Sequence, residues 1–403
     1  MERNNLTWVQ LTSLKVGGAI CLPVIMAGHA LCQNFGLESA LVAVMIGNAI
    51  LLLIALTMAR MSFKSGMTTT DNAREFFGPV GTRCFAAALI ITKTCWIAIQ
   101  LGLMALSLKV LLPTLIPESI VHIVLGALVI GVAIQGIGAL SRLTTLSLPL
   151  LVLTMAYALY STSGLEPVAQ SIPFTFEGIS LTMATTITAV IDMPTYFRHA
   201  KSKWDGMIAA AVFIGVGVPL IEGVGIYLCH QHPGMTVIDT LRHVDSPLWN
   251  IWVSVFLMLA GWSTNNSNLY SAVAGLGTLM PNLSDKVRTL LIGAVGIILS
   301  LCGILQSFMF VLQLLGVMVA SMGCVIFTRY LLNRVYTMTP TPRINLMMWM
   351  LGAVVGLSTA GKWVTITGIP LIDACSVAIL TTAVSHLIQY LQAKFKLKDR
   401  VEV

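Results

Sequence analysis

The chain alternates between short polar segments and apolar stretches of about 20 residues, the length at which a helix crosses a bilayer. These stretches recur from one end to the other and leave no room for a soluble domain. Because the bilayer core offers no water to unpaired backbone groups, each stretch is predicted to be a helix. The sequence therefore predicts an all-α integral membrane protein with a single transmembrane domain over residues 1–403. Its twelve predicted spans are 14–33, 37–60, 82–112, 119–138, 143–162, 177–197, 205–229, 247–270, 287–305, 308–329, 345–361 and 370–392.

Lysine and arginine concentrate in every second connecting segment, beginning with the N-terminal one. Of the 23 such residues, only Lys109, Arg242 and Lys362 fall in the alternate segments, and Lys15 and Lys93 fall within spans. Positive residues accumulate on the cytoplasmic side of membrane proteins. The pattern predicts an even number of spans with both termini in the cytoplasm. The net charge of +7 then reflects topology and not nucleic-acid binding.

The composition excludes several other classes of protein. Charged residues make up 10% of the chain and hydrophobic residues 57%, whereas a soluble domain has about 25% charged residues. The eight cysteines form no CxxC pair, and the CHQH run at 229–232 matches no common metal-ligand spacing. No HExxH, P-loop or GxSxG motif is present, so we expect no enzyme. A channel would show a continuous polar lining, but polarity here is confined to four places.

One of these four polar regions is 261–268, where six of eight residues are polar within an apolar span. Polar groups without partners are expensive in hydrocarbon, which favours a binding site. Ala260, Ser263 and Thr264 stand at i, i+3 and i+4, so one helix face carries a carbonyl and two hydroxyls, as a small cation prefers. The alternative is that these groups only hold neighbouring helices together.

Two spans contain features that interrupt a helix. In the first span Pro23 cannot donate to the carbonyl of Ala19, and Gly17 and Gly18 precede it, so carbonyls at 17–20 become available. A simple proline kink is the alternative. The sixth span contains four threonines within 182–188 and then Pro194. The two interrupted spans, the first and the sixth, stand five spans apart. This spacing is expected of an inverted five-helix repeat with a site at the membrane midplane.

The third span places Lys93, Trp96 and Gln100 on one face. An indole offers a flat surface to a planar ring, while an ammonium and a carboxamide offer hydrogen bonds. Ionisable residues inside a membrane indicate function because they are expensive there. The alternative for Lys93 is structural pairing with a carboxylate such as Glu222 or Asp373.

With these features, the chain resembles the nucleobase–cation symporter-1 family of the purine–cytosine permease type, which includes cytosine and hydantoin permeases. The resemblance extends over most of the chain. Its landmarks are 44–48, 66–70, 77–81, 192–201, 262–265 and 269–270.

The resemblance implies an inverted five-plus-five repeat of the LeuT type plus two extra helices. Helices 1–5 would span about 14–162, helices 6–10 about 177–329, and helices 11–12 about 345–392. It also implies a sodium site made of carbonyls from the first helix and a carbonyl and two hydroxyls from the eighth. The matching positions are Gly17, Ile20, Ala260, Ser263 and Thr264.

For the substrate, the resemblance implies stacking on Trp96 and polar contacts from the third, sixth and eighth helices. Two positions depart from the family pattern: Met183 replaces a frequent aromatic residue, and Lys93 replaces a neutral one, which favours a ligand with a carbonyl or anionic edge. The predicted substrate-binding residues are Leu22, Lys93, Trp96, Gln100, Thr182, Met183, Thr185, Thr186, Asn265 and Asn268.

The resulting hypothesis is a symporter that imports a nucleobase or related small heterocycle with sodium by alternating access. Such a symporter would need no cofactor beyond the coupling ion, and the sequence does not indicate its oligomeric state. One alternative is a proton-coupled transporter of another metabolite, such as an amino acid, in which Lys93 or His29 titrates. A second is a receptor or channel on the same fold.

Overall fold

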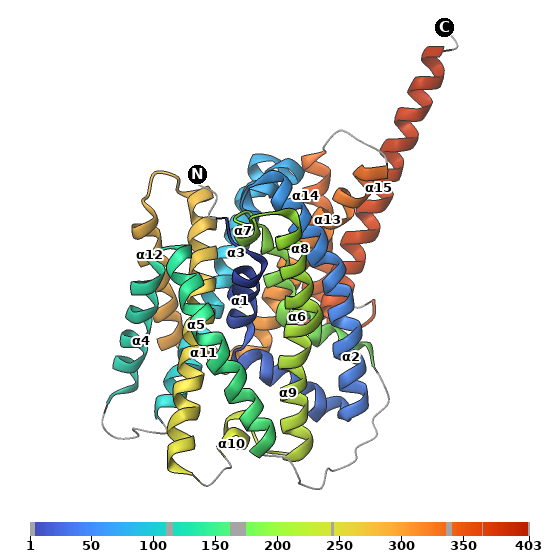
Figure 1. Cartoon of the computed structure of the whole chain (residues 1–403). Coiled ribbons are helices and arrows are strands. Elements are labelled where there is room, and N and C mark those ends of the chain that lie inside the picture. Colours follow the sequence, from blue (N-terminus) through green and yellow to red (C-terminus); the bar gives the residue numbers. More distant parts are fainter. Residues whose placement is uncertain are drawn as a thin grey trace.

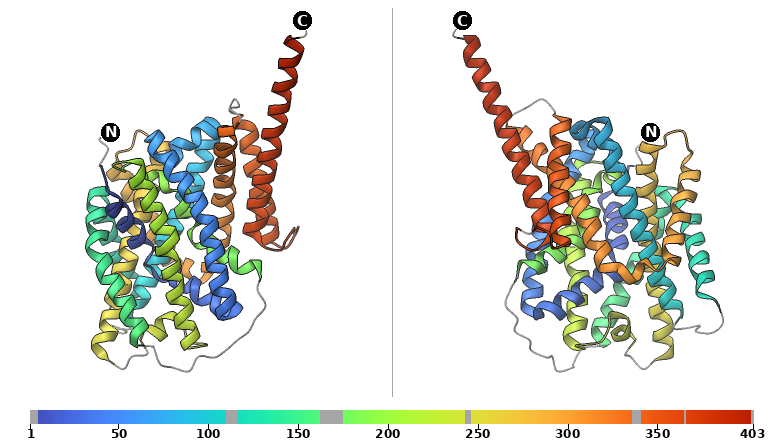
Figure 2. Two further views of the ribbon diagram at one scale, coloured as in Figure 1. Left: turned by 45° about the vertical axis from the view of Figure 1, so that its right-hand side comes forward. Right: turned by 180° about the vertical axis from the view of Figure 1, so that it is seen from behind.

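The structure is a computed structural model that describes residues 5–109, 116–161, 175–242, 246–335, 341–364 and 366–401. Within these ranges all the regular elements are helices, joined by turns and short irregular segments, and the β structure is limited to one isolated bridge between Leu6 and Ala200. The helices pack side by side in one bundle (Figure 1). α1 begins and α15 ends on the same side of this bundle, and the end of α15 projects beyond the other helices (Figure 2). The predicted all-α class is confirmed.

The predicted interruption of the first span is present. α1 (Trp8–Ala19) ends before two non-helical residues, and α2 (Leu22–Ser65) begins beyond them. Cys21 has an extended backbone with φ −145° and ψ 156°. The carbonyl of Ala19, which Pro23 cannot serve, accepts a hydrogen bond of 2.8 Å from the N–H of Cys21. The break is therefore a stable local structure and not a gentle kink.

The next two helices are longer than the predicted spans, since each continues across a bend at a glycine. α2 joins the rest of the first span to the second, and it bends at Gly36, where φ is 73°. α3 (Thr69–Lys109) bends at Gly78, where φ is 64°, just before Pro79. Left-handed φ values are accessible to glycine without the steric cost that a Cβ imposes.

The sixth span is also interrupted. α6 (Phe176–Ile191) ends at Asp192, and α7 (Met193–Phe197) follows directly. α8 (Lys203–Val212) then continues through a π-helical turn, η1 (Phe213–Gly217), into α9 (Val218–Gln231).

The remaining helices complete the bundle around these broken ones. α11 packs along α3, α12 packs against α3 and α4, and α13, α14 and α15 pack together. Their bounds are α4 (Glu118–Ala133), α5 (Ile137–Ser161), α10 (Val237–Leu241), α11 (Pro247–Leu279), α12 (Asp285–Leu301), η2 (Ile304–Ser307), α13 (Phe308–Val335), α14 (Pro342–Ala360) and α15 (Pro370–Val401).

By length and composition, seven helical segments among the described residues could cross a membrane. They are α2, α3, α5, the stretch from α8 to α9, α13, α14 and α15. The predicted first and second spans fall partly within the single helix α2, and α4 has only 16 residues. The exact number of crossings and the inverted repeat therefore stay predictions.

α2 and α9 cross at very close range because both carry glycine at the crossing. A Cβ at Gly28 would lie 1.9 Å from the carbonyl oxygen of Glu222, and a Cβ at Gly225 would lie 1.9 Å from that of Ile25. Small residues allow helix backbones in membranes to approach each other in this way. The crossing fixes α9 against the part of α2 that follows the break.

We expect Gly225→Ala to lower the thermal unfolding temperature in detergent, because the added methyl meets backbone that has no rotamer to yield. Overpacking of this kind costs about 1–3 kcal/mol. Gly223→Ala is the matched control, since a Cβ there has nothing within 4 Å. Equal unfolding temperatures for the two variants would contradict the close crossing.

Candidate functional site

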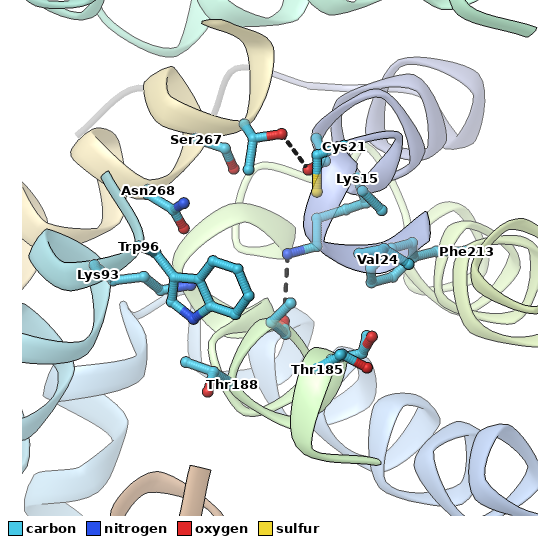
Figure 3. A pocket seen from close by; sticks show the side chains of 15 residues that line it. Lys15, Cys21, Val24, Lys93, Trp96, Thr185, Thr188, Phe213, Ser267 and Asn268 are labelled. Atoms are coloured by element: carbon cyan, nitrogen blue, oxygen red, sulfur yellow. Dashed lines mark hydrogen bonds between the residues drawn. The ribbon is translucent and has the colours of Figure 1, made fainter. Parts of the chain in front are cut away.

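A cavity of about 600 Å³, its opening included, lies where the break between α1 and α2 faces α3, α6 and α11 (Figure 3). Six predicted residues line it: Lys93, Trp96, Thr185, Thr186, Thr264 and Asn268. The other lining residues are Lys15, Gly18, Ala19, Cys21, Val24, Thr188, Ala189, Phe213 and Ser267.

At the end of α1 several carbonyl groups leave the helical hydrogen-bond pattern. The N–H of Ile20 donates to Val16 (2.9 Å), and the N–H of Cys21 turns to Ala19. The carbonyl of Gly17 is thereby passed over, because its usual donor four residues later binds elsewhere. These groups give the broken helix hydrogen-bonding capacity at its end.

The same pattern continues at the start of α2, where the N–H of Val24 donates to Cys21 (3.2 Å) and so passes over the carbonyl of Ile20. The carbonyl of Gly18 accepts a hydrogen bond of 2.8 Å from the hydroxyl of Thr264. α11 therefore reaches the break directly, at a glycine within the predicted run of available carbonyls but not among the predicted sodium ligands.

The hydroxyls of α11 differ in their partners. Thr264 donates to Gly18 and, at 2.9 Å, to the carbonyl of Ala260 in its own helix. Ser263 is fully buried, and its Oγ has no hydrogen-bond partner within the described part of the chain. A buried hydroxyl without a partner is costly. Together with the free carbonyls, this oxygen fits the donor set of a small hard cation such as sodium.

Lys93 pairs with Asp192, at 3.4 Å between Nζ and Oδ2, and both side chains are buried. The alternative partners considered from the sequence bind elsewhere. Glu222 accepts hydrogen bonds from Asn48 (2.7 Å) and Thr185 (3.4 Å). The carboxylate of Asp373 is held by neighbouring groups of the α14–α15 connection. An ion pair was thus a correct alternative, but with another carboxylate.

Asp192 joins three helices from its position at the break of the sixth span. Its Oδ1 accepts hydrogen bonds from Thr69 of α3 (3.0 Å) and Thr195 of α7 (2.7 Å), and its Oδ2 accepts one from Ser271 of α11 (2.5 Å). With Lys93, four donors surround one fully buried carboxylate. The carboxylate is therefore well compensated, and its network fixes one end of the cavity.

Lys15 also lines the cavity, although sequence reasoning used it only to define topology. Its Nζ donates to the carbonyl of Ala189 (3.3 Å) and lies 4.5 Å from the ring centre of Tyr196 and 5.3 Å from that of Phe213. Its position inside the first predicted span was the available signal, because charged residues at that depth are rare.

Five predicted substrate residues are buried outside the lining of the cavity. Thr182 packs against Gly47 of α2, so its place is at a helix crossing. The amide of Asn265 points toward the sulfur of Met104, at 3.9 Å. Leu22, Gln100 and Met183 are likewise buried in the protein. Of the predicted sodium ligands, Gly17, Ile20, Ala260 and Ser263 also lie outside the lining, whereas Thr264 belongs to it.

The broken helices, the interior polar cavity and the apolar exterior define a multi-pass membrane transporter. The family model described as "Permease for cytosine/purines, uracil, thiamine, allantoin" matches residues 1–344. The cytosine permease of Escherichia coli (strain K12) is 24% identical over 390 residues, which cover 94% of this chain and 90% of that protein. The chain therefore belongs to the cytosine/purine permease family. As a member, it is a permease and not an enzyme.

Solved structures share the fold. Mhp1, a nucleobase-cation-symport-1 family transporter solved in a closed conformation with bromovinylhydantoin bound, has a TM-score of 0.72 at 17% identity, covering 94% of this chain and 92% of its own. A Na⁺-coupled sialic acid symporter in a substrate-bound outward-open state has a TM-score of 0.73 at 11% identity, covering 95% of this chain and 90% of its own. The family resemblance identified from the sequence is confirmed.

We expect Lys93→Met to destabilise the protein strongly, because it leaves Asp192 buried without its cation. Removing one partner of a buried ion pair costs about 3–5 kcal/mol. The double variant Lys93→Met/Asp192→Asn should lose less than the sum of the two single variants. Thermal unfolding of the four proteins in detergent measures this difference, and strictly additive losses would show that the pair does not couple.

Proposed function

We propose that this permease is a symporter that imports a nucleobase or related small heterocycle together with sodium. In this proposal twelve helices, ten of them in an inverted five-plus-five repeat, form a single domain in a bacterial-type inner membrane with both termini in the cytoplasm. The observation that carries it is the cavity itself, because Trp96 lines it together with hydroxyl-bearing residues of α6 and α11 and with the broken end of α1. The bromovinylhydantoin bound to Mhp1, the Na⁺ coupling of the sialic acid symporter and the family description support it.

The proposed mechanism couples the two ligands through the broken helix. Sodium would bind carbonyls of the first span and hydroxyls of Ser263 and Thr264, while the substrate would bind against Trp96. Ion binding would then order the end of α1 against α11 and raise the population of the substrate-competent state. Discontinuous helices serve transporters in this way because their ends expose backbone groups where a ligand replaces the missing hydrogen bonds.

Proton coupling is the second candidate, and Glu222 favours it. In the described part of the chain, this fully buried carboxyl group has hydrogen bonds from Asn48 and Thr185 and pairs with no lysine or arginine. A buried carboxylate without a cation is expensive, so the group is better accommodated with a proton. Thr185 connects it to the cavity. Uptake driven by a proton gradient and indifferent to sodium would select this candidate.

We expect Thr264→Ala to raise the sodium concentration for half-maximal uptake at least several-fold, because the variant removes an oxygen ligand from the ion. Uptake by proteoliposomes over a sodium titration measures this effect. Thr289→Ala is the control: Thr289 is also buried, but its hydroxyl donates within α12 to Asp285. Sodium-independent uptake by the native protein would contradict the ion assignment.

We expect Trp96→Ala to weaken substrate binding by roughly tenfold to a hundredfold, since stacking of a base on an aromatic side chain contributes about 1–3 kcal/mol. Trp96→Phe should lose much less, because it retains an aromatic face. Equilibrium binding to purified protein measures both variants. Equal affinity in native protein and Trp96→Ala would assign the indole to packing and move the substrate elsewhere.

A further inference from the structure

The ammonium group of Lys15 enters the cavity without a carboxylate partner. Lys15 is 5% exposed and extends from α1 toward the centre of the cavity, with Trp96 on the opposite side (Figure 3). Its contacts in the described part of the chain are the carbonyl of Ala189 and the faces of Tyr196 and Phe213. A carbonyl dipole and aromatic faces both favour a cation, so these contacts orient the ammonium. They carry no net negative charge.

The one carboxylate at this end of the cavity is already fully engaged. Asp192 pairs with Lys93 and accepts hydrogen bonds from three hydroxyl groups. Glu222 is another buried carboxyl group that contacts a residue of the lining. It accepts hydrogen bonds from Asn48 and from the lining residue Thr185. Two lysines thus line a cavity in which Asp192 balances one of them. In the described part of the chain no carboxylate lies at ion-pair distance from Lys15, so its buried amino group lacks the counter-charge that Lys93 has.

From this imbalance we infer that the cavity selects heterocycles that carry a negative charge, either on an oxygen attached to the ring or on a carboxylate. Lys15 is the residue that selects them. The inference rests on the proposed function and narrows its substrate class. The anion binds the ammonium of Lys15 while its ring stacks on Trp96. Lys93 acts with Asp192 to position the wall and is not the principal contact of the anionic group.

The physical reason is the cost of an uncompensated charge away from water. A neutral heterocycle that fills the cavity offers the buried amino group of Lys15 only a dipole, which leaves the ammonium without a counter-charge. An anion of the same size returns a full charge and forms a charge-assisted hydrogen bond. The hydroxyls of Thr186 and Thr188 also line the cavity and can bind the other polar edges of the ring. Selection therefore depends on charge more than on shape.

A matched set of ligands tests this inference with the purified full-length protein. Uracil and barbiturate form one pair of similar size, and hypoxanthine and urate form another; the second member of each pair is an anion at neutral pH. Equilibrium binding is measured by competition against a labelled heterocycle and by thermal shift. In the native protein we expect the anion of at least one pair to bind roughly tenfold or more tightly than its neutral partner, as a hydrogen bond to a charged group allows.

Variants of Lys15 assign the effect to one residue. Lys15→Met keeps the length of the side chain without its charge, and it should weaken binding of the anion by about tenfold or more while changing the neutral partner by less than about threefold. Lys15→Arg keeps the charge and should keep the preference for the anion. Lys109→Met is a control for general charge effects, because Lys109 lies 54% exposed on the surface, paired with Glu118.

Two results would overturn this inference but leave the proposed function intact. The first is a native protein that binds the neutral member of each pair as tightly as the anion or more tightly, which needs no variant. The second is an equal loss of anionic and neutral ligands in Lys15→Met with no recovery in Lys15→Arg, which would make Lys15 a structural residue. Failure of every heterocycle to bind, with no effect of Trp96→Ala, would overturn the proposed function and this inference together.

Discussion

The structure depends on a buried carboxylate at a point where a helix is broken. Asp192 lies between α6 and α7, and its two oxygens hold α3 through Lys93 and Thr69 and α11 through Ser271. Charged groups at this depth persist only when they are paired and hydrogen-bonded. The network therefore fixes α3 and α11 relative to the end of α6, and these three helices carry most of the polar residues that line the cavity.

The second break, between α1 and α2, gives the cavity its other wall. Carbonyls that leave the backbone ladder near Gly17 and Ile20 remain near the hydroxyls of α11, and the contact between Thr264 and Gly18 joins the two helices directly. The first span thus carries some of the proposed ion ligands together with Lys15, the inferred anion contact. Because both lie on this one short segment, occupation of either proposed site would change the ordering of the same element, which would couple the two.

The similarity to known proteins establishes the family and the fold, while the residues around the cavity show features specific to this chain. Two lysines line its cavity, and Met183 lies at a position where the sequence resemblance led us to expect an aromatic residue. Membership of the cytosine/purine permease family is compatible with several heterocycles, as its description states. The inferred preference of the cavity for anions would distinguish among them.

The sequence by itself determined the helical class, the interruption of the first and sixth spans and the face that carries Lys93 and Trp96. These features follow from local rules: apolar length, the missing N–H of Pro23 and the spacing of positions along one helix. Five predicted substrate residues were placed outside the lining, Thr182 among them, because helical spacing gives a face but not the neighbour that it meets. The partner of Lys93, the entry of Lys15 into the cavity and the contact of Thr264 with Gly18 were decided only by tertiary structure. Each joins residues far apart in the chain, and their proximity depends on how whole helices pack.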